Sequence, residues 1–200
     1  MKEIGIMGGA FSPIHFAHLL TAQRGQEQFD LESVLFIPSG EPPHKREDLL
    51  DKDFRFEMVE AGVRGNPRFQ ASRIEIDRPG TTWSIDTLYQ LREQYGNGYR
   101  LNFIIGDDNL RSVAGYNRRE EFLSLCRLLV CPRKAKFNRN RIRYWKGRLG
   151  LNDLHVIDCP LIPISSTLIR EWVKMGRSIR YLVPDPVAEI IEARGHYLVG

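Results

Sequence analysis

Two segments toward opposite ends of the 200-residue chain contain residue types that bind phosphate groups. The histidine segment, Gly8 to His18, reads G-G-A-F-S-P-I-H-F-A-H, and the serine–arginine segment, Ile164 to Arg170, reads I-S-S-T-L-I-R. Glycine lets a backbone approach a phosphate closely, and imidazole and guanidinium groups donate hydrogen bonds to phosphate oxygens. Together the two segments predict binding sites for phosphate groups.

In the histidine segment, His15 and His18 lie about one helical turn apart, so both side chains can reach one site. The N-terminus of the helix that follows adds N–H groups and a positive dipole end. No G-K-[ST] follows, as a Walker A loop requires, and Gly5-Ile6-Met7 breaks the dinucleotide-binding G-x-G. A structural role for one histidine stays open. Zinc binding with His44 is disfavoured because no carboxylate or cysteine stands nearby in the sequence.

In the serine–arginine segment, Ser165 or Ser166 is a natural N-cap for the helix that follows. The serine hydroxyls, the N–H groups of that helix start and Arg170 also form a second site for an anion, because a guanidinium group can bind two phosphate oxygens at once. The capping role and the anion-binding role are compatible.

The elements that must position these segments alternate along the chain. Strands are expected at 2–7, 34–37, 69–76, 101–105, 127–131 and 154–157, and helices at 18–29, 54–63, 84–95, 166–174 and 186–193. The strands are continuous apolar runs, which predicts an α/β fold: a Rossmann-like doubly wound parallel sheet with helices on both faces. We expect one domain over 1–200, with the C-terminal helical part, about 165–200, packed on it. Ligands of such folds bind at the carboxyl ends of the strands.

Composition narrows the class of protein. The apolar fraction of 42% and the charged fraction of 27% are ordinary for a globular protein. The sequence has no apolar run long enough to predict a membrane span or a signal peptide. It has three cysteines and no C-x-x-C pair, which favours the cytoplasm. The net charge of +4 fits either a nucleic acid or a small anionic ligand. The basic, aromatic-containing stretch 133–148 could bind nucleic acid, but a solvated amphipathic helix is the commoner case.

The two phosphate-binding segments resemble the paired motifs of the nucleotidylyltransferase superfamily, and the whole chain is similar to bacterial nicotinate-nucleotide adenylyltransferases. Four further stretches carry the narrower resemblance. They are 37–45 (I-P-S-G-E-P-P-H-K), 82–88 (T-W-S-I-D-T-L), 103–108 (F-I-I-G-D-D) and 176–184 (G-R-S-I-R-Y-L-V-P).

The resemblance implies transfer of AMP from ATP to nicotinate mononucleotide, giving nicotinate adenine dinucleotide and pyrophosphate. The acceptor phosphate attacks the α-phosphorus, and no base is needed because this phosphate is already an anion near pH 7. Positioning and charge stabilisation then do most of the work. Mg²⁺ is expected to bridge the ATP phosphates, with no metal site built from protein ligands. Expected partners are ATP and nicotinate mononucleotide, with no nucleic acid and no membrane. Self-association into a homo-oligomer stays open.

The resemblance also implies roles for individual residues. Catalytic roles fall to His15, His18, Lys45 and Arg170, with His18 expected to stabilise the transition state. Both histidines and Arg170 also bind ATP, together with Gly8, Gly9, Ala10, Phe11, Gly106, Asp108, Ile164, Ser165 and Ser166. The acceptor is expected to contact Lys45, Trp83, Ser84 and Tyr116, with the Ser84 N–H meeting the pyridine carboxylate.

Five residues, at four places in the chain, depart from the family pattern. Ser12 stands where Asp is usual, Phe16-Ala17 replaces Asn-Gly, Tyr116 replaces a Trp and Ser84 replaces a Thr. Tyr116 keeps an aromatic face for stacking.

Transfer to nicotinamide mononucleotide or phosphopantetheine is the alternative activity, and an RNA-binding module is the alternative class.

Overall fold

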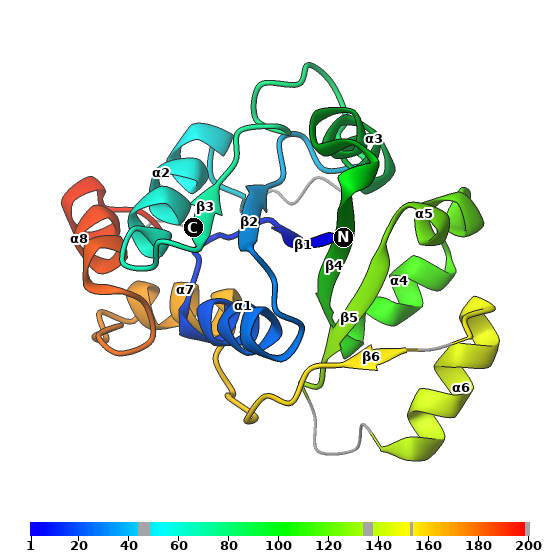
Figure 1. Ribbon diagram of the computed structural model, residues 1–200. Coiled ribbons are helices and arrows are strands. Elements are labelled where there is room, and N and C mark those ends of the chain that lie inside the picture. The colour runs from blue at the N-terminus through cyan, green and yellow to red at the C-terminus, as the bar shows by residue number, and fades with distance from the viewer. Residues whose placement is uncertain (44–48, 134–137, 153, 199–200) are drawn as a thin grey trace. The chain divides into compact units, whose positions relative to one another are not determined.

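The computed structural model describes residues 1–43, 49–133, 138–152 and 154–198. Strands and helices alternate along the chain (Figure 1). The strands are β1 (Lys2–Gly9), β2 (Ser33–Pro38), β3 (Phe69–Ala71), β4 (Tyr99–Gly106), β5 (Arg127–Cys131) and β6 (His155–Val156). The helices are α1 (Phe16–Gln28), α2 (Lys52–Val63), α3 (Ser84–Tyr95), α4 (Leu110–Ala114), α5 (Arg119–Leu125), α6 (Arg139–Leu149), α7 (Ser166–Lys174) and α8 (Asp185–Arg194), with 3-10 turns η1 (Gly96–Gly98) and η2 (Asp107–Asn109).

The described strands form a six-stranded sheet in the order β3-β2-β1-β4-β5-β6. The chain divides into two compact units, and β1, α1 and β2 each run from one unit into the other. The first unit comprises Met1–Met7, Thr21–Val34 and Ser84–Ile162, and the second comprises Gly8–Leu20, Leu35–Trp83 and Pro163–Gly200.

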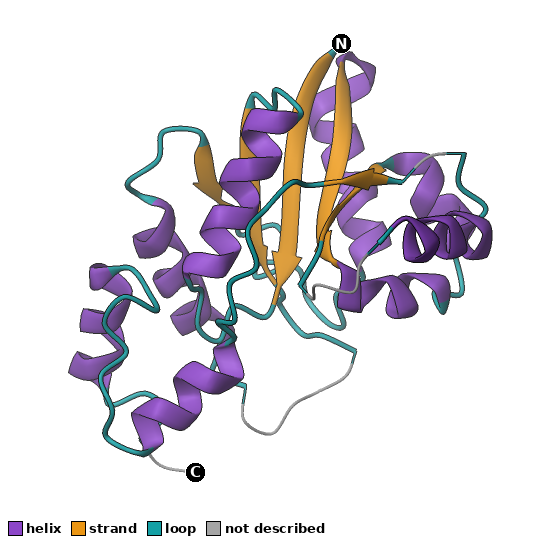
Figure 2. Ribbon diagram, turned by 90° about the horizontal axis from the view of Figure 1, so that it is seen from below, coloured by secondary structure: helices purple, strands orange, loops and turns teal. Residues whose placement is uncertain are grey.

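In the first unit, β1, β4, β5 and β6 pair in parallel (Figure 2). Successive residues of a strand point to opposite faces, and β4 shows a helix on each. The Phe103 ring meets the α5 residue Phe122 edge to face, with centroids 5.2 Å apart. The Ile104 side chain instead faces Gly25 of α1, where a Cβ would lie 3.5 Å from its Cδ1. This two-sided covering explains why both faces of the strand are apolar, and it confirms the predicted fold class.

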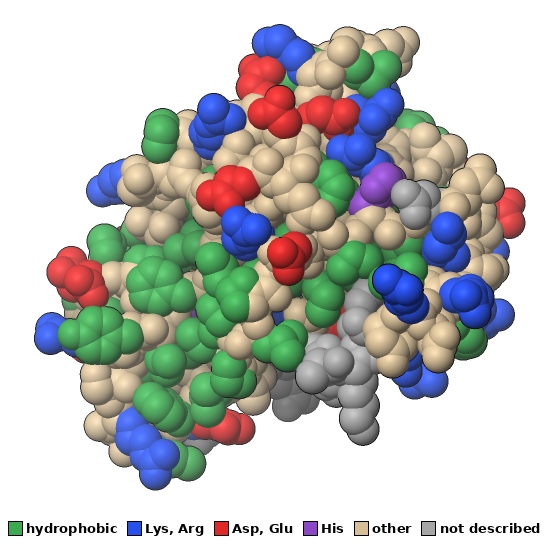
Figure 3. All heavy atoms as spheres, turned by 60° about the horizontal axis from the view of Figure 1, so that its bottom comes forward, with side chains coloured by type: hydrophobic (Ala, Val, Ile, Leu, Met, Phe, Trp, Pro, Cys, Tyr) green, Lys and Arg blue, Asp and Glu red, His purple; other side chains and the backbone are tan. Residues whose placement is uncertain are grey.

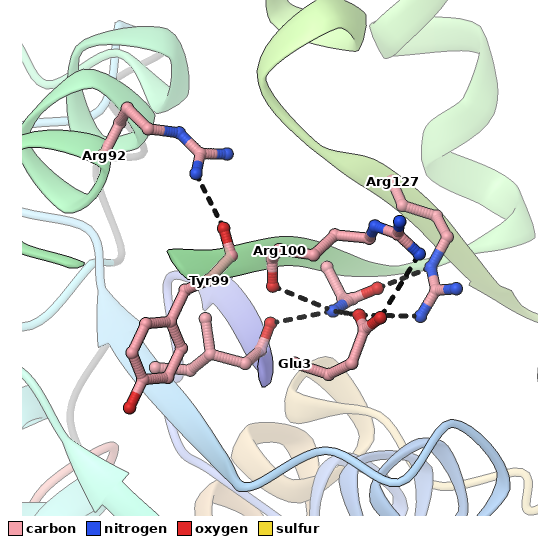
Figure 4. A network of polar contacts seen from close by, with 7 residues as sticks. Glu3, Arg92, Tyr99, Arg100 and Arg127 are labelled. Atoms are coloured by element: carbon pink, nitrogen blue, oxygen red, sulfur yellow. Dashed lines mark hydrogen bonds and ion pairs between the residues drawn. The ribbon is translucent and has the colours of Figure 1, made fainter. Parts of the chain in front are cut away.

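A polar network closes one end of this sheet (Figure 4). Glu3 accepts hydrogen bonds from the Arg127 and Arg100 guanidinium groups at 3.1 and 3.2 Å, and from the Asn102 amide at 2.8 Å. Arg127 Nε also donates to Asn102 Oδ1 at 2.6 Å. Asn102 is fully buried, so these partners offset the cost of burying its amide. The network links β1, β4 and β5 by side chains as well as by backbone.

In the second unit, α2 packs against α8 (Figure 1). Gly62 of α2 permits close contact, because a Cβ there would lie 3.1 Å from Ile14 Cγ2 and 3.3 Å from Val187 Cγ2. At the rim, Arg194 of α8 pairs with Glu57 of α2 at 2.9 Å. The C-terminal segment therefore shares a core with the loop that follows β1.

Most predicted elements agree with the structure to within one or two residues, but the strand predicted over 69–76 is wrong beyond Ala71. There the Asp77 N–H bonds to the Arg73 carbonyl, and Arg73 Nε donates to the Asp77 carboxylate at 3.0 Å. This local turn replaces strand pairing. The short helices α4 and α5 were not predicted, whereas α6 confirms the predicted basic amphipathic helix. Across the described residues, none of the helices has the length and apolar character needed to span a membrane.

Candidate nucleotide-binding site

The histidine segment connects the end of β1 to the start of α1, as predicted. The rings of His15 and His18 stack with centroids 3.6 Å apart and an interplanar angle of 21°. His15 is buried, at 1% exposure, while His18 is half-buried. His18 is therefore the more accessible of the two rings, and His15 packs against it.

One contact determines which ring nitrogen of neutral His18 carries the proton. The backbone N–H of His15 points at His18 Nδ1, 3.3 Å away. A ring nitrogen that accepts a hydrogen bond carries no proton, so neutral His18 holds its proton on Nε2. The ring thus presents an N–H donor on its far edge, the group needed to bind a phosphate oxygen.

Phe11 shapes the same loop. Its φ of +46° is in the left-handed region, which is unusual for a residue other than glycine. Its buried ring meets His18 edge to face, with centroids 5.1 Å apart. The predicted ATP-binding residues Gly8, Gly9 and Ala10 precede it, and all three are at least partly exposed.

The serine–arginine segment contacts the histidine segment within the second unit. Arg170 Nη1 donates to the Ser12 carbonyl at 2.9 Å, and Ser166 Oγ donates to the Pro13 carbonyl at 2.9 Å. Ser165 Oγ accepts from the Leu168 N–H at 3.1 Å and is the N-cap of α7. The predicted capping role is confirmed for Ser165. The two segments predicted to bind phosphate, some 150 residues apart in sequence, are therefore neighbours.

Ser12, which departs from the family pattern, has a hydrogen-bond partner in Tyr197. Ser12 is buried, and its Oγ lies 3.0 Å from the hydroxyl of Tyr197. Ile164, another predicted ATP-binding residue, lies in the loop just before the Ser165 cap and is half-buried.

Two further predicted ATP-binding residues, Gly106 and Asp108, lie in the first unit, where β4 ends. Asp107 Oδ1 accepts from the Arg133 N–H at 2.7 Å, and Asp108 Oδ1 lies 3.6 Å from Arg133 Nε. A Cβ on Gly106 would come within 2.3 Å of Asp108 Oδ1 and 2.6 Å of Arg133 Nε. Residue 106 must therefore be glycine for both side chains to lie where they do. No side-chain cap bond is made at the start of η2 or α4, so Asp108 does not act as their cap.

The predicted acceptor residues fall on several elements. Ser84 is the first residue of α3 in the first unit, and Trp83, 52% exposed, is the last residue of its segment in the second unit. Tyr116 of the first unit is 38% exposed and meets Phe122 edge to face at 5.4 Å. Lys45 lies outside the described residues, as does His44.

An ion-pair network joins the α3 start to the segment that follows Tyr116. Arg118 Nη1 lies 3.7 Å from Asp86 in the first turn of α3, and Arg118 also makes two hydrogen bonds of 2.6 Å to Glu121. The bonds from Arg118, followed by one from Tyr89, lower the pKa of Glu121 to about 2. Within the first unit, Arg118 thus links the elements that carry Ser84 and Tyr116.

Two residues with contacts to the predicted site were missed. Arg55 lies on the buried stripe of α2 with Met58 and Val59, yet a charged helical residue is usually placed on the solvent side. An arginine at that position of the apolar pattern was the available signal. Arg133 was noted only as part of the basic stretch, and its place after β5 was the signal overlooked.

Among the described residues, no group of three or more His, Cys, Asp or Glu side chains could hold a metal ion.

The arginines of α6 are exposed, and blue side chains gather on the side of the molecule where α6 lies (Figure 3). Trp145 and Leu149 form the buried side of this helix.

The chain belongs to the Cytidylyltransferase-like family, whose model matches residues 6–172. Within that class, the chain belongs to the family of nicotinate-nucleotide adenylyltransferases. It is 38% identical over 199 residues to a "Probable nicotinate-nucleotide adenylyltransferase" of Moorella thermoacetica, covering 98% of this chain and 91% of the relative. The protein of the same description from Acidothermus cellulolyticus is 40% identical over 200 residues, covering 98% and 94%.

A solved structure shows the same fold. It is Plasmodium falciparum nicotinic acid mononucleotide adenylyltransferase complexed with NaAD, with a TM-score of 0.82 and 17% identity, and the match covers 98% of both chains.

Proposed function

We propose that this chain transfers AMP from ATP to the 5′-phosphate of nicotinate mononucleotide, forming nicotinate adenine dinucleotide and releasing pyrophosphate. One observation carries the proposal: α7 donates hydrogen bonds from Arg170 and Ser166 to the carbonyls of Ser12 and Pro13, in the same segment as the stacked histidines. Two sources of phosphate-binding groups are thereby brought together. The full-length similarity to relatives described as nicotinate-nucleotide adenylyltransferases supports the choice of acceptor.

The proposed chemistry relies on charge stabilisation. The acceptor phosphate attacks the α-phosphorus of ATP, the bond to the β-phosphate oxygen breaks, and pyrophosphate leaves. His18 donates its Nε2–H to a phosphate oxygen as negative charge shifts, and the N–H groups from Gly9 to Phe11 add further donors. The N-terminus of α7 and Arg170 bind the leaving pyrophosphate. His15 holds the His18 ring in place.

The remaining residues bind the rest of the two substrates. Asp108 accepts from the ATP ribose hydroxyls, and Arg133 beside it holds that carboxylate in place. The Ser84 N–H at the start of α3 meets the pyridine carboxylate, since a helix N-terminus favours an anion. Trp83 and Tyr116 supply aromatic faces for the pyridine ring, and Lys45 supplies a positive charge to phosphate.

Mg²⁺ belongs to the proposal as part of the ATP substrate. The described side chains offer no cluster that fits a resident metal ion, and Mg²⁺ commonly keeps water and phosphate ligands. ATP would therefore bring the ion and most of its coordination.

The test is pyrophosphate release with ATP and Mg²⁺, comparing nicotinate mononucleotide, nicotinamide mononucleotide and phosphopantetheine. We expect turnover with the nicotinate nucleotide, and a fall in kcat of about 100- to 1000-fold in His18→Ala, because one transition-state donor is lost. His155→Ala on β6 is the matched control and should keep wild-type kcat. Turnover with phosphopantetheine alone would reject the acceptor. Equal activity of His18→Ala and wild type would reject the mechanism.

Two further expectations are part of this proposal. We place the protein in the cytoplasm, where the three free cysteines would stay reduced. We expect no nucleic-acid partner, and a homo-oligomer is left to size-exclusion chromatography with light scattering.

A further inference from the structure

The Arg55 side chain donates hydrogen bonds to several separate segments, and the histidine segment is one of them. Arg55 lies on α2 and is 1% exposed. Nε donates to the Leu50 carbonyl at 2.9 Å. Nη1 donates to the Ala10 carbonyl at 2.9 Å and points at Ser39 Oγ at 3.4 Å. Nη2 donates to the carbonyls of Ser39 and Gly40 at 2.6 and 3.2 Å. The five N–H groups of a guanidinium thus have five acceptors.

These acceptors come from separate parts of the second unit. Ala10 follows β1 and belongs to the histidine segment, whereas Ser39 and Gly40 follow β2 and Leu50 precedes α2. The Ser39 N–H also donates to the Gly9 carbonyl at 2.9 Å, so the ends of β1 and β2 are tied directly as well. Burial lowers the pKa of Arg55, opposed first by the charge of Asp51. A buried cation at this position requires its full set of acceptors.

The contact with Ala10 has a directional consequence. In a trans peptide the carbonyl C=O and the following N–H point in opposite directions across one plane. When Arg55 holds the Ala10 oxygen, the Phe11 N–H must therefore point away from Arg55. The same hold stabilises the left-handed backbone of Phe11, whose ring packs against His18 at 5.1 Å. Arg55 thus fixes both a backbone donor and the neighbour of the proposed catalytic histidine.

The contact with Gly40 connects Arg55 to the segment that precedes α3. The next residue, Glu41, forms a β-bridge with Thr81, and its carbonyl accepts from the Thr82 N–H at 2.8 Å. Trp83, one of the proposed acceptor-binding residues, follows directly in the chain. One side chain therefore connects the loop proposed for ATP to the segment that leads to an acceptor residue.

We propose that Arg55 is a positioning residue for adenylyl transfer: through the Ala10, Ser39 and Gly40 carbonyls it aims the Phe11 N–H and His18 at the reacting phosphates. This inference rests on the proposed function. The N–H groups of Arg55 are directed at protein acceptors, so Arg55 acts through these carbonyls and not on a substrate itself. Its loss should affect the rate of the chemical step more than the binding of ATP, because misplacing a transition-state donor by about 1 Å can lower the rate about 100-fold.

The test uses two variants and one control. Arg55→Lys keeps the charge with fewer, differently placed donors, and Arg55→Gln keeps two donors without the charge. Arg194→Lys, which alters another arginine in contact with α2, is the control. We expect either folded Arg55 variant to lose about 100-fold in kcat while KM for ATP changes by less than about fivefold. The control should keep wild-type kcat and KM.

A second readout does not need turnover. The Phe11 amide resonance of the ¹⁵N-labelled protein is followed during titration with α,β-methylene-ATP. It should shift clearly in wild type and in Arg194→Lys, and much less in the Arg55 variants. If wild type shows this shift without using nicotinate mononucleotide, and the shift is lost in the variants, the proposed function fails and the inference stands.

Other outcomes overturn the role of Arg55. Folded variants with lower melting temperatures but wild-type kcat and an unchanged Phe11 shift would make Arg55 a purely structural residue. Failure of both Arg55 variants to fold would assign it to stability alone.

Discussion

Gly40→Ala should strongly destabilise the protein. A Cβ at this position would lie 2.1 Å from the Glu75 carbonyl oxygen and 2.9 Å from its carbonyl carbon. Carbon contacts are optimal at about 3.5–4.0 Å, so the backbone must move by about 1 Å. Overpacking of this kind costs about 1–3 kcal/mol. Displacing Gly40 also weakens its hydrogen bond from the charged Arg55, worth about 1.5–3 kcal/mol. We expect a total near 4 kcal/mol, a large part of the about 5–15 kcal/mol of a typical domain.

The assay is urea unfolding followed by circular dichroism, with thermal melting as a second measure. A loss of about 4 kcal/mol lowers the melting temperature by about 8–16 °C in a protein of this size. Gly65→Ala is the matched control. No atom lies within 4 Å of its Cβ position, and it should change stability by less than about 1 kcal/mol. If the two variants unfold at the same urea concentration, the close approach of Gly40 to Glu75 is refuted.

Three other predictions address the site, the pH dependence and the basic helix. Gly106→Ala should raise KM for ATP with little change in melting temperature, because its Cβ would displace only the flexible ends of Asp108 and Arg133; a wild-type KM contradicts this. Burial and then the Arg194 charge lower the pKa of His196 below 6.5, so the unfolded chain binds the proton more readily. Stability should therefore fall as pH drops below about 6.5, and melting of His196→Gln from pH 7.5 to 5.5 should show a weaker dependence. Replacing all four arginines of α6 by glutamine should leave kcat unchanged. If the wild type instead binds single-stranded RNA in a salt-sensitive way, and the variant does not, that result favours the nucleic-acid alternative.

The fold was predictable because its information lies in local apolar patterns. β5, α3 and α7 begin and end at the predicted residues, since each is a run of apolar or amphipathic sequence with a clear boundary. The short helices α4 and α5 span too few turns for a periodic pattern to emerge, and they depend on packing such as that of Phe122 against Phe103. The strand after Ala71 failed for a related reason, because apolar residues there fit a turn as well as a strand.

The sequence supported predictions about the candidate site only where the residue types themselves suggest chemistry. Histidines one turn apart and a serine-capped helix start have a signal in residue types. Arg55 has only the weaker signal of a charged residue on an apolar helix face, because its partners are backbone carbonyls, and every residue carries one. The same limit applies to Gly106, whose need for glycine arises from Asp108 and Arg133 across the turn. Contacts of this kind depend on the folded backbone and cannot be read from spacing.

The contacts around the loop after β1 share one electrostatic feature: in each of them a side-chain donor binds a backbone carbonyl of the loop. Arg55 of α2 holds the Ala10 carbonyl, and Arg170 and Ser166 of α7 hold the carbonyls of Ser12 and Pro13. Donors from two helices thus occupy the loop's partially negative oxygens. Since each trans peptide directs its N–H opposite to its carbonyl, the Phe11 N–H faces away from Arg55. A loop whose oxygens are occupied in this way presents positive potential to a ligand even without a lysine. Under the proposed function, the backbone of this loop therefore favours a bound anion, and His18 adds a further donor for phosphate.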